Sequence, residues 1–191
     1  IVAGTWAFAA AVTGGRVQIR GAEPSHLGVV LDKLRAAGCD VDVAEGRFTV
    51  QGPSRPRAIN VSTLPYPGFP TDLQPFVVAL NAVAEGSGII TENVFEARWG
   101  FTAELERLGA RVHLDGHHAR VDGVAASQLS GAPVEVMDIR AGATLVIAGM
   151  AAGGVTEVSG IEHIDRGYEH FVENLARAGA DVQRRIHPSR G

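Results

Sequence analysis

The sequence has 191 residues, with little lysine, little cysteine and no long apolar run. Lys33 is the only lysine, and the 17 basic residues are outnumbered by 21 acidic ones, which leaves a net charge of −4. Proteins that bind nucleic acid usually carry a basic excess, so we expect no nucleic-acid partner. No stretch reaches the roughly 18 apolar residues that a membrane helix needs, so we expect no membrane partner either.

Cys39 is the only cysteine. One cysteine cannot form an internal disulfide, and this usage suits the reducing cytoplasm, where we expect the protein to act. His163 and His170 are seven residues apart in the sequence, yet no third ligand accompanies them at a metal-binding spacing. The sequence therefore predicts neither a metal nor another cofactor.

An apolar helical pattern begins directly after Ile1, which is not an initiating methionine. We interpret the chain as a piece of a longer one. Its hydrophobic fraction of 46% and charged fraction of 20% are ordinary for a globular protein. We predict that residues 1–191 form a single domain.

Three copies of a Leu-x-x-x-Gly-x-x-Val signature divide the sequence into units of about 70 residues. In each copy we expect the leucine to face the core from the last helical turn. The glycine is expected to adopt the left-handed conformation that stops a helix, and the valine to begin a strand. The copies are Leu34/Gly38/Val41, Leu105/Gly109/Val112 and Leu175/Gly179/Val182, within repeats at approximately 1–52, 65–123 and 134–185.

Each signature is preceded by an apolar helical block, a glycine-rich turn and a β-rich run. The helical blocks that start near Phe76 and Ala143 are apolar nearly all round, which is typical of buried helices. Asp115 and Gly116 between two alternating runs predict a β-hairpin. The fold class we expect is α/β (α+β), as an inside-out α/β barrel of three repeated units with helices inside and sheets outside.

Four short motifs lie on this repeat frame: residues 65–74 (PYPGFPTDLQ), 91–98 (TENVFEAR), 138–143 (DIRAGA) and 163–169 (HIDRGYE). In this order and spacing they make the chain resemble the enolpyruvyl transferases, and within them the branch that acts on UDP-N-acetylglucosamine. The similarity runs from about Gly4 to Val182. It is similarity to the C-terminal half of such an enzyme.

The resemblance implies a two-domain transferase with its substrates in the cleft between the domains. Such an enzyme moves the enolpyruvyl group of phosphoenolpyruvate onto the 3-hydroxyl of UDP-N-acetylglucosamine and releases phosphate, as the first committed step of peptidoglycan synthesis. The implied partners are these two substrates and the missing N-terminal half. With half of the site absent, we expect the chain alone to bind weakly and to turn over little.

The resemblance also implies roles for individual residues. Asp72 matches the aspartate that contacts the sugar 3-hydroxyl and serves as candidate general base. Arginine suits the carboxylate and phosphate of phosphoenolpyruvate because its planar guanidinium group matches their geometry. The implied catalytic residues are Asp72, Arg98 and Arg166, and the implied substrate-binding residues are Asp72, Val94, Phe95, Arg98, Asp138, Arg140 and Arg166. The family's nucleophilic cysteine belongs to the other domain, so Cys39 is not that residue.

Several of these residues also have a purely structural interpretation. Asp72 precedes an apolar helix, where capping residues are common. Arg166 could form a surface ion pair with Asp165 or Glu169, and such pairs carry little information. Arg140 could likewise pair with Asp138 at a junction between loop and helix.

Two other functions stay open on the sequence alone. One is the sister transferase that acts on 3-phosphoshikimate, which shares the fold and the arginine-rich cleft. The other is a non-catalytic paralogue or excised domain that binds without turnover. The motifs at residues 65–74 and 163–169 favour the UDP-N-acetylglucosamine branch over the first of these.

Overall fold

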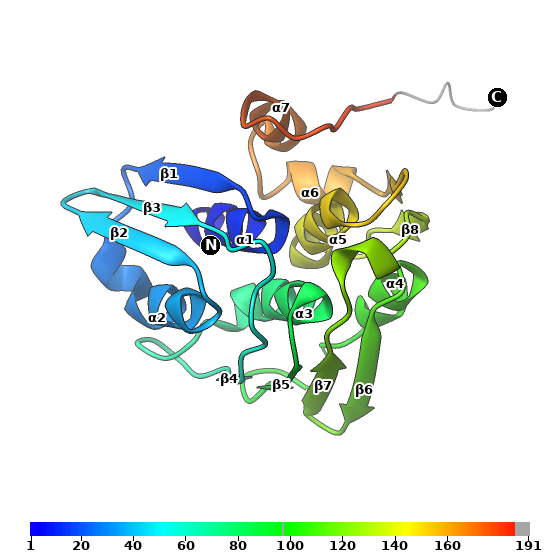
Figure 1. The fold of residues 1–191 in the computed structure, drawn as a ribbon, viewed down its shortest axis with the longest axis horizontal. Coiled ribbons are helices and arrows are strands. Elements are labelled where there is room, and N and C mark those ends of the chain that lie inside the picture. The colour runs from blue at the N-terminus through cyan, green and yellow to red at the C-terminus, as the bar shows by residue number, and fades with distance from the viewer. Residues whose placement is uncertain (97, 186–191) are drawn as a thin grey trace.

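Three helices, one from each predicted repeat, lie at the centre of the computed structural model and pack on one another (Figure 1). The structure describes residues 1–96 and 98–185, so Ala97 of the second motif and the last six residues of the predicted domain lie outside the described residues. The central helices carry mostly apolar residues with short side chains, so they can pack closely. All ten residues of the second one are buried. They are α1 (Val2–Thr13), α3 (Gln74–Val83) and α5 (Ile139–Ala151).

The first unit follows its central helix with an antiparallel sheet. Helix α1 ends at Gly14, whose φ of 70° is left-handed. The sheet has the order β1-β3-β2, and its middle strand turns Phe48 and Val50 into the core. The elements after α1 are β1 (Arg16–Arg20), η1 (Pro24–Leu27), α2 (Gly28–Ala36), β2 (Asp40–Ala44) and β3 (Arg47–Gln51).

After its central helix, the second unit repeats the succession of strand, helix and two strands seen in the first unit, and it contains the predicted hairpin. Strands β6 and β7 pair antiparallel, with Asp115 opposite His118 and Gly116 in the turn at a φ of 57°. The sheet has the order β4-β5-β7-β6, with β4 parallel to β5. The other elements are β4 (Val61–Ser62), η2 (Thr71–Leu73), β5 (Ser87–Thr91), α4 (Thr102–Arg107), β6 (Arg111–Asp115) and β7 (His118–Asp122).

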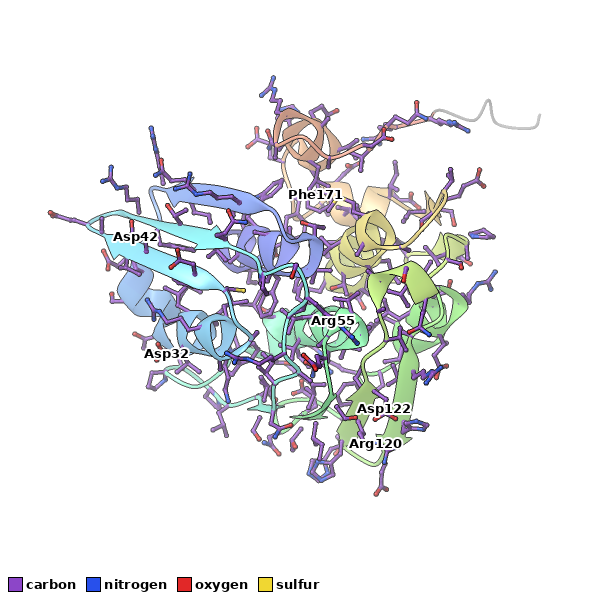
Figure 2. All side chains as sticks on the ribbon, in the orientation of Figure 1. Asp32, Asp42, Arg55, Arg120, Asp122 and Phe171 are labelled. Carbon is purple, nitrogen blue, oxygen red and sulfur yellow. The ribbon has the colours of Figure 1, made fainter. Side chains whose placement is uncertain are left out.

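The third unit has a two-stranded parallel sheet and a divided helix. His170 adopts a left-handed φ of 51° and separates α6 from α7, so His163 and His170 do not share a helix. Phe171, labelled in Figure 2, packs α7 on the rest of the molecule, with its ring centroid 5.8 Å from that of Trp6. The elements are η3 (Ala126–Gln128), β8 (Pro133–Glu135), β9 (Glu157–Ser159), α6 (Glu162–Asp165) and α7 (Phe171–Arg177).

The three predicted helix stops share one geometry. Gly38, Gly109 and Gly179 have φ values of 98°, 99° and 98°. The residue after each glycine donates its N–H to the carbonyl of the signature leucine, at 3.0, 3.1 and 3.0 Å. This is the bond of a Schellman motif, which satisfies carbonyls that the helix leaves unpaired.

The prediction that a strand begins at Val182 is wrong. Val41 and Val112 lie in β2 and β6, but residues 180–185 form no strand. The physical reason is the absence of a ladder: β2 and β6 are paired by β3 and β7, whereas no described segment pairs with residues 180–185. A valine with strand propensity does not form a strand without such a partner.

The mixed helix and strand content agrees with the predicted fold class, and α1, α3 and α5 pack on one another at the centre while other helices lie at the periphery (Figure 1). The sheets are three separate ones, and among the described residues none is closed on itself. In the same part of the chain, no helix has both the length and the apolar character needed to cross a membrane.

Candidate active site

Asp72 stands in the turn that leads into central helix α3. Pro70 and Leu73 occupy the cap positions of η2 and α3, and neither helix start has a side-chain cap bond. The capping interpretation of Asp72 therefore does not describe this structure. Its carboxylate is free to face other parts of the molecule.

The Asp72 carboxylate faces two arginines from different segments. Arg140 Nη1 donates to Asp72 Oδ1 at 2.6 Å, and Arg98 Nη1 lies 3.7 Å from the same oxygen. All three side chains are between a quarter and a third exposed, so solvent only partly screens their charges. One carboxylate thus lies between two guanidinium groups. Guanidinium groups are suited to bind carboxylate and phosphate groups.

The guanidinium group of Arg98 contacts an aromatic ring and a hydroxyl group. Its guanidinium carbon lies 3.6 Å from the centre of the Phe95 ring, and its Nη1 is 3.5 Å from Thr71 Oγ1. Burial lowers the pKa of Arg98, and repulsion from Arg140 lowers it further. An arginine keeps its charge despite such shifts, so both guanidinium groups are available to an anion.

Asp138 is the N-cap of central helix α5. Its Oδ1 accepts the backbone N–H groups of Arg140 and Ala141 at 2.9 and 3.0 Å. The same oxygen lies 3.7 Å from Arg140 Nε, so the suspected pairing of these two residues is also present. The cap explains why α5 starts four residues before the predicted Ala143. It also fixes the first turn, from which Arg140 reaches Asp72.

A pocket of about 260 Å³ opens beside the two arginines. Gln74 contributes to its wall, and the Gln74 Nε2 atom is buried with no hydrogen-bond partner among the described residues. A buried amide without a partner is costly. The pocket is lined by Thr71, Gln74, Pro75, Arg98, Gly100, Phe101, Glu104, Glu135, Met137, Asp138, Arg140 and Ala141.

Val94 and Phe95 are half-exposed on the loop after β5, where a bound molecule can reach them. Arg166 is exposed at the end of α6 and does not line the pocket. Its suspected ion-pair partner Asp165 is bonded instead to Arg184, with 2.7 Å between Arg184 Nη2 and Asp165 Oδ2. The structure thus brings Asp72, Arg98, Arg140 and Asp138 together and leaves Arg166 apart from them.

Two polar residues near this cluster were not predicted from the sequence as site residues. Glu92 is 98% buried and accepts hydrogen bonds from Thr63, Thr71 and the backbone of the Val94–Phe95 turn. Tyr168 lies near the cluster as well: burial raises its pKa, and the charge of Asp72 adds to the rise. Both residues belong to the quoted motifs, and that membership is the signal that could have pointed to them.

No group of three or more histidine, cysteine, aspartate or glutamate side chains in residues 1–96 and 98–185 is arranged to hold a metal ion. The chemistry of the cluster is that of a carboxylate beside two fixed cations. It suits proton transfer next to a bound anion.

Solved structures with this fold are enolpyruvyl transferases. The enolpyruvyl transferase NikO from Streptomyces tendae matches with a TM-score of 0.86 and 33% identity, over 95% of this chain and 43% of that one. An EPSP synthase from Acinetobacter baumannii matches with a TM-score of 0.74 and 21% identity, over 95% of this chain and 46% of that one, which supports the fold alone. The fold class is therefore that of an enolpyruvyl transferase.

A family model described as EPSP synthase (3-phosphoshikimate 1-carboxyvinyltransferase) matches residues 1–175. The chain belongs to this family. Curated relatives named UDP-N-acetylglucosamine 1-carboxyvinyltransferase are 56% identical in Mycolicibacterium paratuberculosis and 55% in Mycobacterium leprae, in each case over 96% of this chain. They confirm the resemblance to that branch. The chain spans about 44% of the length of these relatives.

Proposed function

We propose that this chain is the part of a UDP-N-acetylglucosamine 1-carboxyvinyltransferase that carries one wall of its active site. The enzyme would transfer the enolpyruvyl group of phosphoenolpyruvate to the sugar 3-hydroxyl and release phosphate. The observation that supports this most directly is the Asp72 carboxylate 2.6 Å from Arg140 and 3.7 Å from Arg98. The rest of the enzyme would supply the opposite wall.

In this proposal Asp72 is the general base. It takes the proton of the 3-hydroxyl as that oxygen attacks the substituted carbon of phosphoenolpyruvate, whose methylene carbon gains a proton. The resulting tetrahedral intermediate then loses a proton and phosphate, which restores the double bond. A positioned base contributes about 10²–10⁴-fold to such a step.

Arg98 and Arg140 hold the anionic groups of phosphoenolpyruvate in the proposed complex. They are fixed before the substrate arrives, Arg98 by Phe95 and Arg140 by the first turn of α5. Fixed cations stabilise charge that moves during the reaction without having to reorganise. Arg166 would join them when the substrate and the other wall are present, and Val94 and Phe95 would lie against the nucleotide sugar. Asp138 would hold Arg140 in place and face the cleft.

The acceptor proposed here is the nucleotide sugar rather than 3-phosphoshikimate. Relatives that carry the UDP-N-acetylglucosamine name are 51–56% identical over nearly all of this chain, whereas the EPSP synthase structures are 16% and 21% identical. The four motifs lie within residues 1–175, which the family model matches.

We further propose that residues 1–191 are one domain, built as an inside-out α/β barrel of three repeated units. The three mutually packed central helices and the surrounding sheets support this proposal (Figure 1). The repeats are approximately 1–52, 65–123 and 134–185.

Phosphate release tests the function. We would mix phosphoenolpyruvate with either UDP-N-acetylglucosamine or 3-phosphoshikimate and add this chain alone or reassembled with the missing half. The expected result is release with the nucleotide sugar, only in the reassembled protein, and its loss by at least about 10²-fold in Asp72→Asn and a marked loss in Arg166→Ala. No release with either acceptor, from a folded and reassembled protein, would leave a non-catalytic binding module as the function.

A further inference from the structure

A single buried carboxylate joins the two segments that carry the site. Glu92 follows β5, and its side chain lies between η2, which holds Asp72, and the loop that holds Phe95 and Arg98. We infer that Glu92 is a positioning residue, which sets the distance between the base and the arginine in the site proposed above. This inference rests on the proposed function for what the site binds, but its geometry stands without it.

The two oxygens of Glu92 hold different segments. Oε1 accepts the N–H groups of Val94 and Phe95 at 2.9 and 3.1 Å, and the hydroxyl of Thr63 at 2.8 Å. Oε2 accepts the hydroxyl of Thr71 at 2.8 Å. The first oxygen therefore fixes the loop, and the second ties η2 to it.

The Oε1 contacts determine how the loop presents its side chains. With their N–H groups turned inward to the carboxylate, Val94 and Phe95 turn their side chains toward solvent. Phe95 then lies under the guanidinium group of Arg98 at 3.6 Å. A change at Glu92 thus reaches Arg98 through the ring of Phe95.

The Oε2 contact determines where Asp72 stands. Thr71 is the residue before Asp72, and its hydroxyl also lies 3.5 Å from Arg98 Nη1. The contacts from Glu92 through Thr71 to Arg98, and back through Phe95 to Glu92, form a ring beside Asp72. Loss of the Thr71 hydroxyl opens this ring and leaves the charged side chains of the proposed site in place.

The burial of Glu92 gives this role a physical basis. An ionised carboxylate is costly to bury unless donors satisfy it. Four donors surround Glu92, and hydrogen bonds to a charged acceptor are the stronger kind. They rigidify both segments together, which is what a site that must hold two charges at a fixed distance requires.

Two substitutions at Thr71 separate positioning from packing. Thr71→Ser keeps the hydroxyl and loses a methyl group, whereas Thr71→Val keeps the shape and loses the hydroxyl. A positioning role predicts that the serine variant resembles the parent and the valine variant does not. A packing role predicts the reverse. Glu92→Gln is the nearly isosteric companion, and Glu23→Gln is a control for the same chemical change, because Glu23 also accepts a backbone N–H but caps η1 on the surface, away from the site.

The first measurement needs no ligand. Side-chain protons of Arg98 lie over the Phe95 ring, so ring current shifts their NMR signals upfield. We expect these signals to keep their positions in Thr71→Ser and Glu23→Gln and to move toward ordinary arginine values in Thr71→Val and Glu92→Gln. Unchanged Arg98 signals in Thr71→Val would overturn the inference, even if Glu92→Gln fails to fold.

The second measurement is the affinity for phosphoenolpyruvate by calorimetric titration. Thr71→Val and Glu92→Gln should each weaken binding by about tenfold, and together no more than either alone, because they break one contact chain. Equal affinity in the valine variant and the parent would overturn the inference. If the chain reassembled with its missing half binds no phosphoenolpyruvate while the Arg98 signals follow the expected pattern, the positioning role is supported and the proposed ligand is wrong.

Discussion

The oxygen of Asp72 that is closest to Arg140 is also the one closest to Arg98. In the function proposed above, the anion of a substrate would bind the same two guanidinium groups as this carboxylate. The base and the anion would therefore compete for the same fixed cations. A bound anion would weaken the pair between Asp72 and Arg140 and leave Asp72 freer to accept a proton.

The competition predicts a gain of affinity from a loss of charge. We expect Asp72→Asn to bind phosphoenolpyruvate about two- to fivefold more tightly than the parent, since a partly exposed ion pair contributes up to about 1 kcal/mol, even though the proposed function predicts that the same change lowers turnover by at least about 10²-fold. Calorimetric titration would measure this. Asp32→Asn is the control, because Asp32 pairs with Arg35 at 2.8 Å on the outer helix α2 (Figure 2) and changes the net charge equally. Equal affinities of the two variants would refute the competition.

Burial raises the pKa of the Cys39 thiol to about 11 from its ordinary 9.0. The folded state then keeps the proton that the unfolded state loses, so stability falls as the pH rises from 9.0 toward about 11. We expect a loss on the order of 1 kcal/mol between about pH 8 and about pH 10 in urea unfolding. Cys39→Ala should lack that part of the slope, and an identical slope in the variant would contradict the prediction.

Because thiolates are the reactive form, native Cys39 should also resist thiol reagents near neutral pH.

The sequence predicted most of the charged residues that lie together in the candidate site, but it did not predict Glu92, the residue proposed to position them. Asp72, Arg98, Asp138 and Arg140 were expected in one place, and the structure brings them there, whereas Arg166 was expected with them and does not line the pocket. Glu92 was not expected there, because its partners are two hydroxyls and two backbone N–H groups spread over three stretches of chain. Such a set has no sequence period or spacing. Its one sequence signal was membership of the motif at residues 91–98.

At the scale of single elements, the helix stops depend on one backbone conformation. Gly38 has a φ of 98°, and an added Cβ there would meet no atom closer than 3.7 Å, so the cost of a side chain is backbone strain alone. Gly28 begins the same helix with a φ of −47° and open space around it. The two ends of α2 therefore form an internal comparison.

We expect Gly38→Ala to lower the free energy of unfolding by about 1 kcal/mol or more, because a side chain strains the left-handed conformation. Gly28→Ala should raise it by up to about 1 kcal/mol, because alanine favours the helix. Urea unfolding of both variants gives the two values. Effects of the same sign would contradict this assignment of the two helix ends.

Elements whose signals are local were predicted well, and those that need distant partners were not. The helix stops and the β6–β7 hairpin depend on glycine within a few residues, and they are present. The strand at Val182 needs a neighbour, and no described segment supplies one. The break between α6 and α7 over residues 166–170 was not predicted either, and at its end His170 has a left-handed φ although it lacks the freedom of glycine.

At the scale of the whole molecule, one buried hydrogen bond joins the first unit to the last. The hydroxyls of Thr5 and Tyr168 are 2.9 Å apart, and both residues are buried. Tyr168 follows Arg166 by two residues, and its ring packs on Phe171 at 5.0 Å between centroids. This contact anchors the segment that carries Arg166 to α1.

We expect Tyr168→Phe to lower the free energy of unfolding by about 1 kcal/mol, the typical net value of one hydrogen bond. Tyr66→Phe is the control, since Tyr66 is 75% exposed and should change stability by less than about 0.5 kcal/mol. Chemical denaturation of both variants measures the difference. Equal effects would show that the Thr5 contact contributes nothing measurable.

The three central helices come from three different units and pack on one another, so the units share one hydrophobic core. Removing one of them would expose an apolar face on each of the other two, and partly folded forms are therefore costly. This makes the molecule cooperative: its units should unfold together in one transition and not one after another. Amide protons of α1, α3 and α5 should then exchange with solvent at a common rate set by complete unfolding. A threefold repeat in sequence thus behaves as a single thermodynamic unit.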